Sequence, residues 1–163
     1  MVFVSTTGVI TKAGAGFKTA ADLKGKKVAV IAGTTNEQAV KEQIREGRLA
    51  NVTLVTVQNR AEGVGALQSG KADGYASDKL LLVGAEFRNA AAFTLLTDDL
   101  SFEPYGIALP QGDWAFRTAV NRGLAHTYRS GLAVQVFRKW FEQVGLSPSG
   151  VMMAVFQFGA LPE

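Results

Sequence analysis

Residues 26–37 read KKVAVIAGTTNE, and this stretch decides the fold. Two lysines precede the continuous apolar run of residues 28–31, which is typical of a strand buried on both faces of a parallel sheet. Gly33 ends the strand. A helix opens directly behind it, because Thr34 and Glu37 have the spacing of a capping box. A buried strand that leads straight into a helix is the unit from which α/β sheets are built.

Strands and helices alternate on both sides of this stretch. The apolar and β-branched runs predict strands at residues 2–11, 51–57, 72–76, 93–96 and 105–109. Helices are expected at residues 34–46 and 61–68 and from Asp78 to about Arg88, with a short helical turn at 19–23. This order predicts an α/β fold with a mostly parallel sheet, because parallel strands are joined by helical crossovers.

The character of the sequence changes after Pro110. Asp113 is a good N-cap for a further helix. An apolar residue then recurs at every fourth position, at Phe116, Val120, Leu124 and Tyr128. A second helix carries an apolar face over residues 136–144 and is expected to end at Gly145. The apolar tail at 151–158 must pack on another surface, in the same chain or in a second one.

Composition excludes several classes of protein. The 163 residues are 47% hydrophobic and 19% charged, which fits a folded domain and excludes a disordered chain. There is no cysteine and one histidine, His126, which argues against thiolate zinc sites, His-rich metal sites and Ser-His-Asp triads. We therefore expect no metal, no cofactor and no catalytic residue, and a surface position for His126. The net charge of +3 is carried by scattered side chains, which argues against nucleic-acid binding.

The beginning of the chain is unusual. Residues 1–7 have no positive segment, no long apolar segment and no small-residue cleavage site, so they do not form a signal peptide. No apolar run approaches the roughly 18 residues that span a bilayer. The sequence is typical of a chain that begins inside a longer protein.

Three places at strand ends are candidates for ligand contacts. The helix start behind Gly33, with the hydroxyls of Thr34 and Thr35, suits a carboxylate or phosphate, and the plainer alternative is a well-capped helix. Asp78 stands at another strand-to-helix junction, where it suits an ammonium group or serves as an N-cap. Arg60, on a strand-end loop, suits a carboxylate or is a solvated loop arginine. No pair of carboxylates is arranged for acid–base work, so binding is favoured over catalysis.

Several motifs in a fixed order resemble a known family. They are DLKGKKVAV at 22–30, GTTNE at 33–37, LQSGKADGYASD at 67–78, YGIAL at 105–109, VN at 120–121 and KWF at 139–141. In this order they resemble the family 3 extracellular solute-binding proteins, the periplasmic amino-acid receptors of ATP-binding-cassette (ABC) importers. The likeness runs from about Phe3 to the end of the chain. It implies the type II periplasmic-binding-protein fold, in which two α/β lobes are joined by two crossing strands and hold the ligand between them.

The resemblance also implies a division of the chain. Residues 1–11 would form one crossing strand, 12–103 a complete second lobe and 104–110 the other crossing strand. Residues 111–163 would be the C-terminal helices and tail of lobe one, most of which would precede Met1. Without that lobe, this chain alone is expected to bind amino acids poorly, near or above millimolar dissociation constants, because several charge-assisted hydrogen bonds are missing. The uncovered apolar faces of the C-terminal helices favour a homodimer.

The family's binding residues map onto five positions of this sequence. The resemblance implies that Thr34 and Thr35 bind the α-carboxylate of the ligand, that Asp78 binds its α-ammonium and that Ile31 lines the pocket. Arg60 would contact a side-chain carboxylate, which favours glutamate or aspartate.

The function implied is that of the amino-acid-binding component of an ABC importer, without enzymatic activity. Its location would be periplasmic, and its partners the amino acid and, in the intact protein, the ABC permease. The alternatives left open are a ligand-sensing domain, a dehydratase-like enzyme of the same fold, and a truncated fragment that binds nothing.

Overall fold

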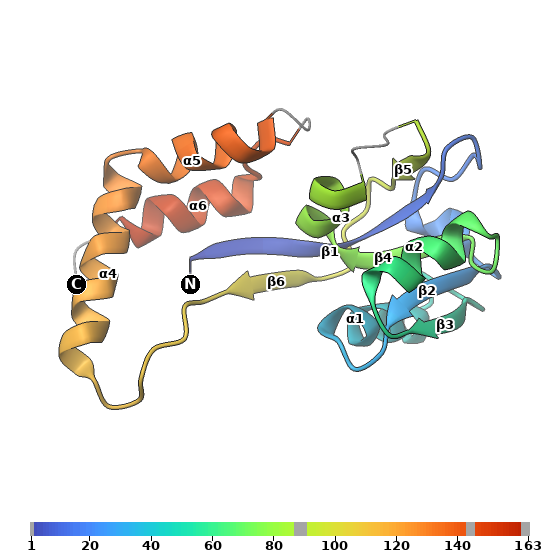
Figure 1. The fold of residues 1–163 in the computed structure, drawn as a ribbon, viewed down its shortest axis with the longest axis horizontal. Helices are drawn as coiled ribbons and strands as arrows, with labels where there is room; N and C mark the ends of the chain where they lie inside the picture. Colours follow the sequence, from blue (N-terminus) through green and yellow to red (C-terminus); the bar gives the residue numbers. More distant parts are fainter. Residues whose placement is uncertain (1, 87–90, 143–145, 161–163) are drawn as a thin grey trace. The chain divides into compact units, whose positions relative to one another are not determined.

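The chain forms two compact units in the computed structural model, which describes residues 2–86, 91–142 and 146–160. Ser5–Glu103 make up the first, called here the sheet unit. Met1–Val4 together with Pro104–Glu163 make up the second, the helical unit. The chain passes between the two units twice, within strand β1 (Phe3–Lys12) and within strand β6 (Phe102–Tyr105) (Figure 1).

The sheet unit follows the strand–helix alternation expected from the sequence. After β1 its elements are η1 (Ala20–Leu23), β2 (Lys27–Ile31), α1 (Thr35–Arg45), β3 (Thr53–Val57), α2 (Arg60–Gln68), β4 (Gly74–Asp78), α3 (Lys79–Glu86) and β5 (Phe93–Leu95). The strand order is β3-β2-β4-β1-β5, with β6 paired to β1. β2 is parallel to β3 and β4, whereas β1 is antiparallel to β4 and β5. The α/β prediction is confirmed, and the sheet is mixed rather than mostly parallel.

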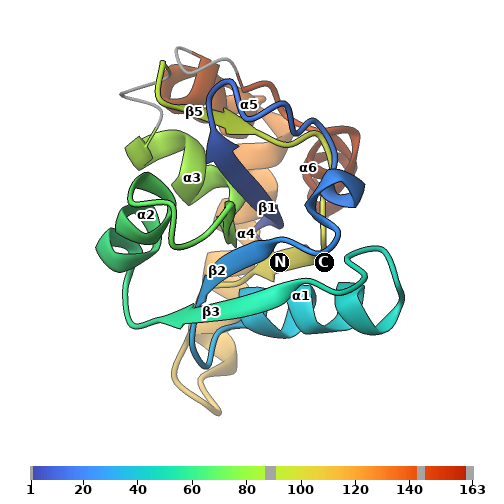
Figure 2. The same ribbon diagram turned by 90° about the vertical axis from the view of Figure 1, so that its right-hand side faces the viewer.

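Two apolar layers cover the two faces of this sheet. Alternate residues of a strand point to opposite faces, so Val28 and Val30 of β2 join one cluster and Ala29 joins the other. The first cluster includes Val40 of α1, and the second includes Leu67 of α2. Figure 2 accordingly shows α1 on one side of β2 and β3, and α2 and α3 on the other.

The helical unit contains α4 (Trp114–Arg129), α5 (Leu132–Phe141) and α6 (Gly150–Gly159). Asp113 caps α4 as predicted, since its Oδ1 accepts a hydrogen bond of 2.9 Å from the backbone N–H of Phe116. The apolar tail forms α6, capped by Ser149, and stacks Phe156 on Tyr128 of α4 at 5.4 Å between ring centroids. The tail therefore packs within the same chain. His126 is exposed, as expected.

Two sequence predictions place elements wrongly. The strand expected at Tyr105–Leu109 lies at Phe102–Tyr105, where it pairs with β1, and the backbone N–H of Val2 bonds the carbonyl of Tyr105 at its end. Arg60, expected on a loop, is the first residue of α2. The expected helix ends at Arg88 and Gly145 lie outside the described residues. In the part of the chain that the structure describes, no helix has the length and apolarity to cross a membrane.

Candidate ligand-binding site

The three parallel strands end at one edge of the sheet. Ile31 closes β2 and pairs with Val57, the last residue of β3. Asp78 closes β4, which is parallel to β2 with Val30 opposite Ala76. Ligands of open α/β sheets bind at this carboxyl edge, where the loops and helix starts gather. All five residues predicted for the site stand on segments that reach or leave this edge.

Thr34 is committed to the start of α1. Its hydroxyl accepts a hydrogen bond from the backbone N–H of Glu37 at 3.2 Å and donates one to the carbonyl of Ile31 at 2.7 Å. Thr35 is exposed, and within the described residues neither its hydroxyl nor its backbone N–H has a hydrogen-bond partner. The N–H of Asn36 is likewise left open by the described part of the chain. Unpaired N–H groups at a helix start attract an anion, so Thr35 offers the donors here.

Glu37 completes the turn differently from the capping box that the sequence predicts. Its carboxylate accepts from the N–H of Gly33 at 2.8 Å, not from that of the capping residue Thr34. Gly33 has a φ of 73°, a left-handed conformation that glycine adopts without strain. The carboxylate also pairs with Lys41 at 2.7 Å. The hydrogen bond from Lys41, followed by that from Gly33, lowers the pKa of Glu37 below its ordinary value of 4.5.

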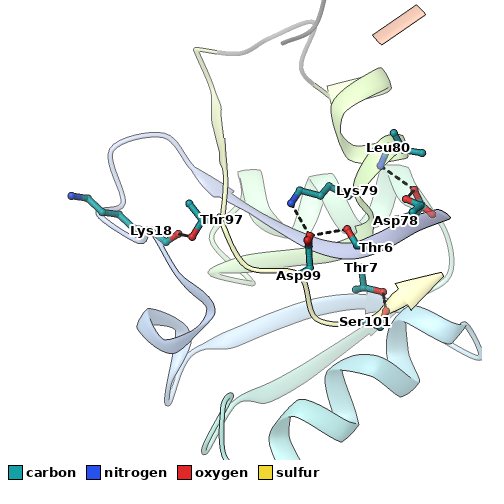
Figure 3. Close-up of polar contacts among 10 residues, drawn as sticks. Thr6, Thr7, Lys18, Asp78, Lys79, Leu80, Thr97, Asp99 and Ser101 are labelled. Atoms are coloured by element: carbon teal, nitrogen blue, oxygen red, sulfur yellow. Dashed lines mark hydrogen bonds and ion pairs between the residues drawn. The ribbon is translucent and has the colours of Figure 1, made fainter. Parts of the chain in front are cut away.

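Asp78 is buried, with 5% of its surface exposed. Its Oδ1 accepts hydrogen bonds from the N–H of Leu80 at 3.0 Å and of Leu81 at 3.4 Å, which caps the start of α3 (Figure 3). The same oxygen accepts from the hydroxyl of Ser5 at 2.8 Å. The capping role that the sequence leaves open for this residue is therefore present.

Arg60 opens α2 because its neighbour is a strong cap. The side chain of Asn59 accepts a hydrogen bond of 3.0 Å from the N–H of Glu62, and the carboxylate of Glu62 accepts from the N–H of Gln58. The helix thus begins one residue earlier than the sequence suggests. Arg60 is half-buried at this helix start, and its charge lies on the segment that follows β3.

Sequence reasoning missed a buried polar cluster on β1. Thr7 is fully buried, and its hydroxyl accepts hydrogen bonds of 2.8 Å from the side-chain amide of Asn36 and from Ser101. Figure 3 shows Ser101 beside Thr7. The sequence offers little signal for this cluster, because Ser5 and Thr7 stand in a run of three hydroxyl residues, Ser5-Thr6-Thr7, that is ordinary for a strand.

Two further observations limit the chemistry. Among the residues that the structure describes, no three His, Asp or Glu side chains gather in a way that would hold a metal ion. The helical unit has an open hollow of about 620 Å³ lined by residues between Ile107 and Asn121, and none of the predicted site residues lines it.

Comparison with known proteins agrees with this architecture. The chain matches the family described as NMT1/THI5 like over residues 2–95. It is 31% identical to the L-glutamate/L-aspartate-binding protein of Pseudomonas aeruginosa over 92% of this chain and 50% of that protein. It is 30% identical to the glutamate/aspartate import solute-binding protein of Escherichia coli over 86% of this chain and 47% of that protein.

Solved structures share the fold. An ancestral arginine-binding protein bound to arginine superposes with a TM-score of 0.65 and 31% identity, over 86% of this chain and 62% of that chain. The chain spans about half the length of the curated relatives it matches. The chain therefore belongs to the NMT1/THI5-like family, and it is homologous to the family 3 amino-acid-binding proteins of ABC importers, with which it shares the type II periplasmic-binding-protein fold.

Proposed function

We propose that the sheet unit carries half of an amino-acid-binding site at the carboxyl edge of β2, β3 and β4. The observation that carries the proposal is the open pair of N–H groups at Thr35 and Asn36 on the same sheet edge as the buried carboxylate of Asp78. An α-amino acid has one carboxylate and one ammonium group, which match these two ends in charge. Thr34 acts by shaping the helix start, and Ile31 by supplying the carbonyl that holds the hydroxyl of Thr34.

An acidic amino acid is the ligand that we infer. Arg60 adds a positive charge at the same edge, and a guanidinium binds a side-chain carboxylate through two parallel hydrogen bonds. The relatives named for glutamate and aspartate binding support this choice. The ancestral arginine-binding protein shows that homologues of similar identity bind a cationic amino acid, so the side-chain contact decides between the two.

The experiment is an NMR titration of the ¹⁵N-labelled chain with L-glutamate, L-aspartate, L-arginine and L-leucine. We expect the amide signals of Thr35, Asn36 and Leu80 to shift with the two acidic ligands, with dissociation constants near or above roughly 1 mM, because the chain spans half of its relatives. Arg60→Met should remove the preference for acidic ligands without abolishing binding. Lys71→Met, a lysine in the exposed turn after α2, is the matched control. No shift with any of the four ligands would overturn the proposal.

We also propose that the intact protein works with an ABC permease on the periplasmic side of the membrane. The support is that the relatives are named as import and binding proteins. Co-purification of the full-length protein with its permease, and its recovery from the periplasmic fraction of cells, test these two statements. Recovery only from the cytosol would contradict the second.

The relatives are named as binding proteins, and we propose that this chain likewise catalyses no reaction. The rival is a dehydratase of the same fold, and turnover of prephenate or arogenate by the purified chain would support that rival.

The homodimer expected from the sequence stays a prediction. The helical unit exposes large apolar side chains, namely Tyr105, Ile107, Trp114, Phe116, Leu132, Val136, Trp140, Val151, Met153 and Phe158. Such a surface is unusual for a monomer. Light scattering at high protein concentration decides the matter, since a single mass of 17.3 kDa would contradict the dimer.

A further inference from the structure

Strand β1 carries three buried hydroxyl side chains on one face, those of Ser5, Thr7 and Thr11, and the first two lie at the end of the strand near the proposed site. Ser5 and Thr7 are two residues apart, so both point to the face that α1 covers, together with Val9 of the first apolar cluster. Successive same-face residues of a strand are roughly 6.6 Å apart. Their exposed fractions are 4% and 0%, so each hydroxyl needs partners inside the protein.

Each hydroxyl is bonded to a different end of the proposed site. Ser5 donates to the carboxylate of Asp78 at 2.8 Å, at the end of β4. Thr7 accepts at 2.8 Å from the side-chain amide of Asn36, in the first turn of α1 and next to Thr35. Thr7 also pairs in register with Asp78 across the antiparallel strands, which places their side chains on the same face.

Further contacts fix the hydroxyl of Thr7. It donates to the carboxylate of Glu103 at 3.2 Å and accepts from Ser101 at 2.8 Å. Ser101 in turn lies 2.7 Å from the same carboxylate oxygen. A hydroxyl has one proton and two lone pairs, so with Asn36, Ser101 and Glu103 its capacity is filled. Thr7 therefore cannot rotate to another partner without leaving one of these groups unsatisfied.

We propose that Asn36 and Thr7 are positioning residues of the amino-acid site. Through them β1 holds the start of α1, and through Ser5 it holds Asp78, so the strand sets the separation of the carboxylate-binding and ammonium-binding groups. The effect on ligand binding rests on the proposed function. The claim that β1 holds the start of α1 does not depend on it. The positioning role belongs to the two side chains, neither of which is assigned a contact with the ligand, whereas the backbone N–H of Asn36 is one of the two donors proposed for the carboxylate.

The experiment compares Thr7→Val, which keeps the shape of the side chain but removes the hydroxyl, with Thr7→Ser, which keeps the hydroxyl. Asn36→Ala removes the other partner. The first readout is hydrogen exchange at the N–H groups of Glu37 and Gln38, which bond Thr34 in the first turn of α1. We expect about tenfold faster exchange in Thr7→Val and Asn36→Ala, because each variant loses one buried hydrogen bond that stabilises the start of α1. Thr7→Ser should exchange at the wild-type rate.

Matched controls separate this effect from a general loss of stability. The N–H of Glu62, bonded to the cap of α2, should exchange at the wild-type rate in every variant. Thr53→Val on β3 and Gln38→Ala on α1, both at exposed positions, should leave the exchange at Glu37 unchanged. Equal acceleration at Glu37 and Glu62 would overturn the inference.

The second readout is the dissociation constant for L-glutamate and L-aspartate, measured by the same titration. We expect Thr7→Val and Asn36→Ala to raise the dissociation constants of both ligands by the same factor of about ten. Thr7→Ser should bind them with wild-type affinity. Altered exchange with unchanged affinity would overturn the positioning role. If the wild-type chain binds neither ligand, the proposed function fails and the ligand part of the inference with it, while the exchange data still decide whether β1 holds α1.

Discussion

Glu37 lies between the ammonium of Lys41 and the N–H of Gly33 at the start of α1, and both contacts favour its ionised form. Its pKa is lowered from 4.5, chiefly by the hydrogen bond from Lys41. A carboxyl group whose pKa is lower in the folded protein stabilises the fold above its unfolded pKa. That contribution is lost as the pH falls through the folded pKa.

The first prediction concerns the pH dependence of stability. The free energy of unfolding of the wild-type chain should fall as the pH drops below 4.5, and Glu37→Gln should fall less steeply over that range, because the amide does not titrate. Urea unfolding followed by circular dichroism between about pH 7 and about pH 3 measures both curves. The curve of Lys41→Met should lie between these two, because this variant removes the largest cause of the lowered pKa of Glu37. Parallel curves for wild type and Glu37→Gln would contradict the contribution of Glu37 to the pH dependence of stability.

Residue roles could be predicted from the sequence only where the partner is a near neighbour. The sequence predicts Thr34 as a cap of α1 and offers capping as one of two roles for Asp78, because a capping side chain bonds an N–H two or three residues ahead. Thr7 was not predicted, since its partners lie 29 and 94 positions away along the chain. Only the folded sheet brings such groups together, and a threonine in a strand is ordinary by composition.

Helix α2 packs very closely on β4. A Cβ atom added at Gly63 would overlap the ring of the fully buried Tyr75, whereas one added at Gly65, two residues later on the same helix, would meet nothing within 4 Å. Comparing the two positions therefore distinguishes the effect of glycine on helix propensity, which both share, from its effect on packing, which only Gly63 has.

The second prediction uses this pair. Gly63→Ala should lower the free energy of unfolding by roughly 1–3 kcal/mol, because the helix or the ring must move. Gly65→Ala should raise it by about 0.5–1 kcal/mol, because alanine is the better helix former at an open position. Denaturant unfolding of both variants measures the difference. Changes of the same sign in the two would contradict the close approach of α2 to Tyr75.

Among the elements, those with a strong local pattern were predicted well. Strand β2 has a charged start and an apolar interior, and α1 has a capping threonine before it and Gly47 behind it, so both lie within a residue or two of the expected bounds. The sequence does not predict α6 as a helix, because its own residues are apolar on nearly every face. Such a segment shows no alternation of polar and apolar faces from which a helical period could be recognised. Strand β6 was misplaced because its position depends on pairing with β1, a strand about 90 residues away along the chain.

At the scale of the whole molecule, burial is distributed unevenly between the two units. Both apolar clusters belong to the sheet unit. In the described part of the helical unit, the buried apolar side chains are Val4, Ala125, Phe137, Met152 and Phe156. Local stability follows buried apolar contact, so the two units should not open together.

The third prediction follows from that difference. Backbone amides of α4, α5 and α6 should exchange with solvent at least about tenfold faster than those of β2 and β4 at neutral pH, because the helices bury less apolar surface. Hydrogen exchange followed by mass spectrometry of peptides measures both units in one sample. If two chains form a dimer through these helices, dilution of the protein should further accelerate the hydrogen exchange of the helix amides. Equal protection throughout the chain would contradict the prediction.

The passage of the chain between its units has a consequence for synthesis on the ribosome. The sheet unit is one uninterrupted segment, Ser5–Glu103, whereas the helical unit takes residues from both ends of the chain. The whole sheet unit is therefore synthesised before the helices of residues 104–163, whose translation takes roughly 3–12 s at about 5–20 residues per second. Folding of the sheet unit can be complete in that time. The helical unit cannot be completed until later, because it also needs the helices of residues 104–163.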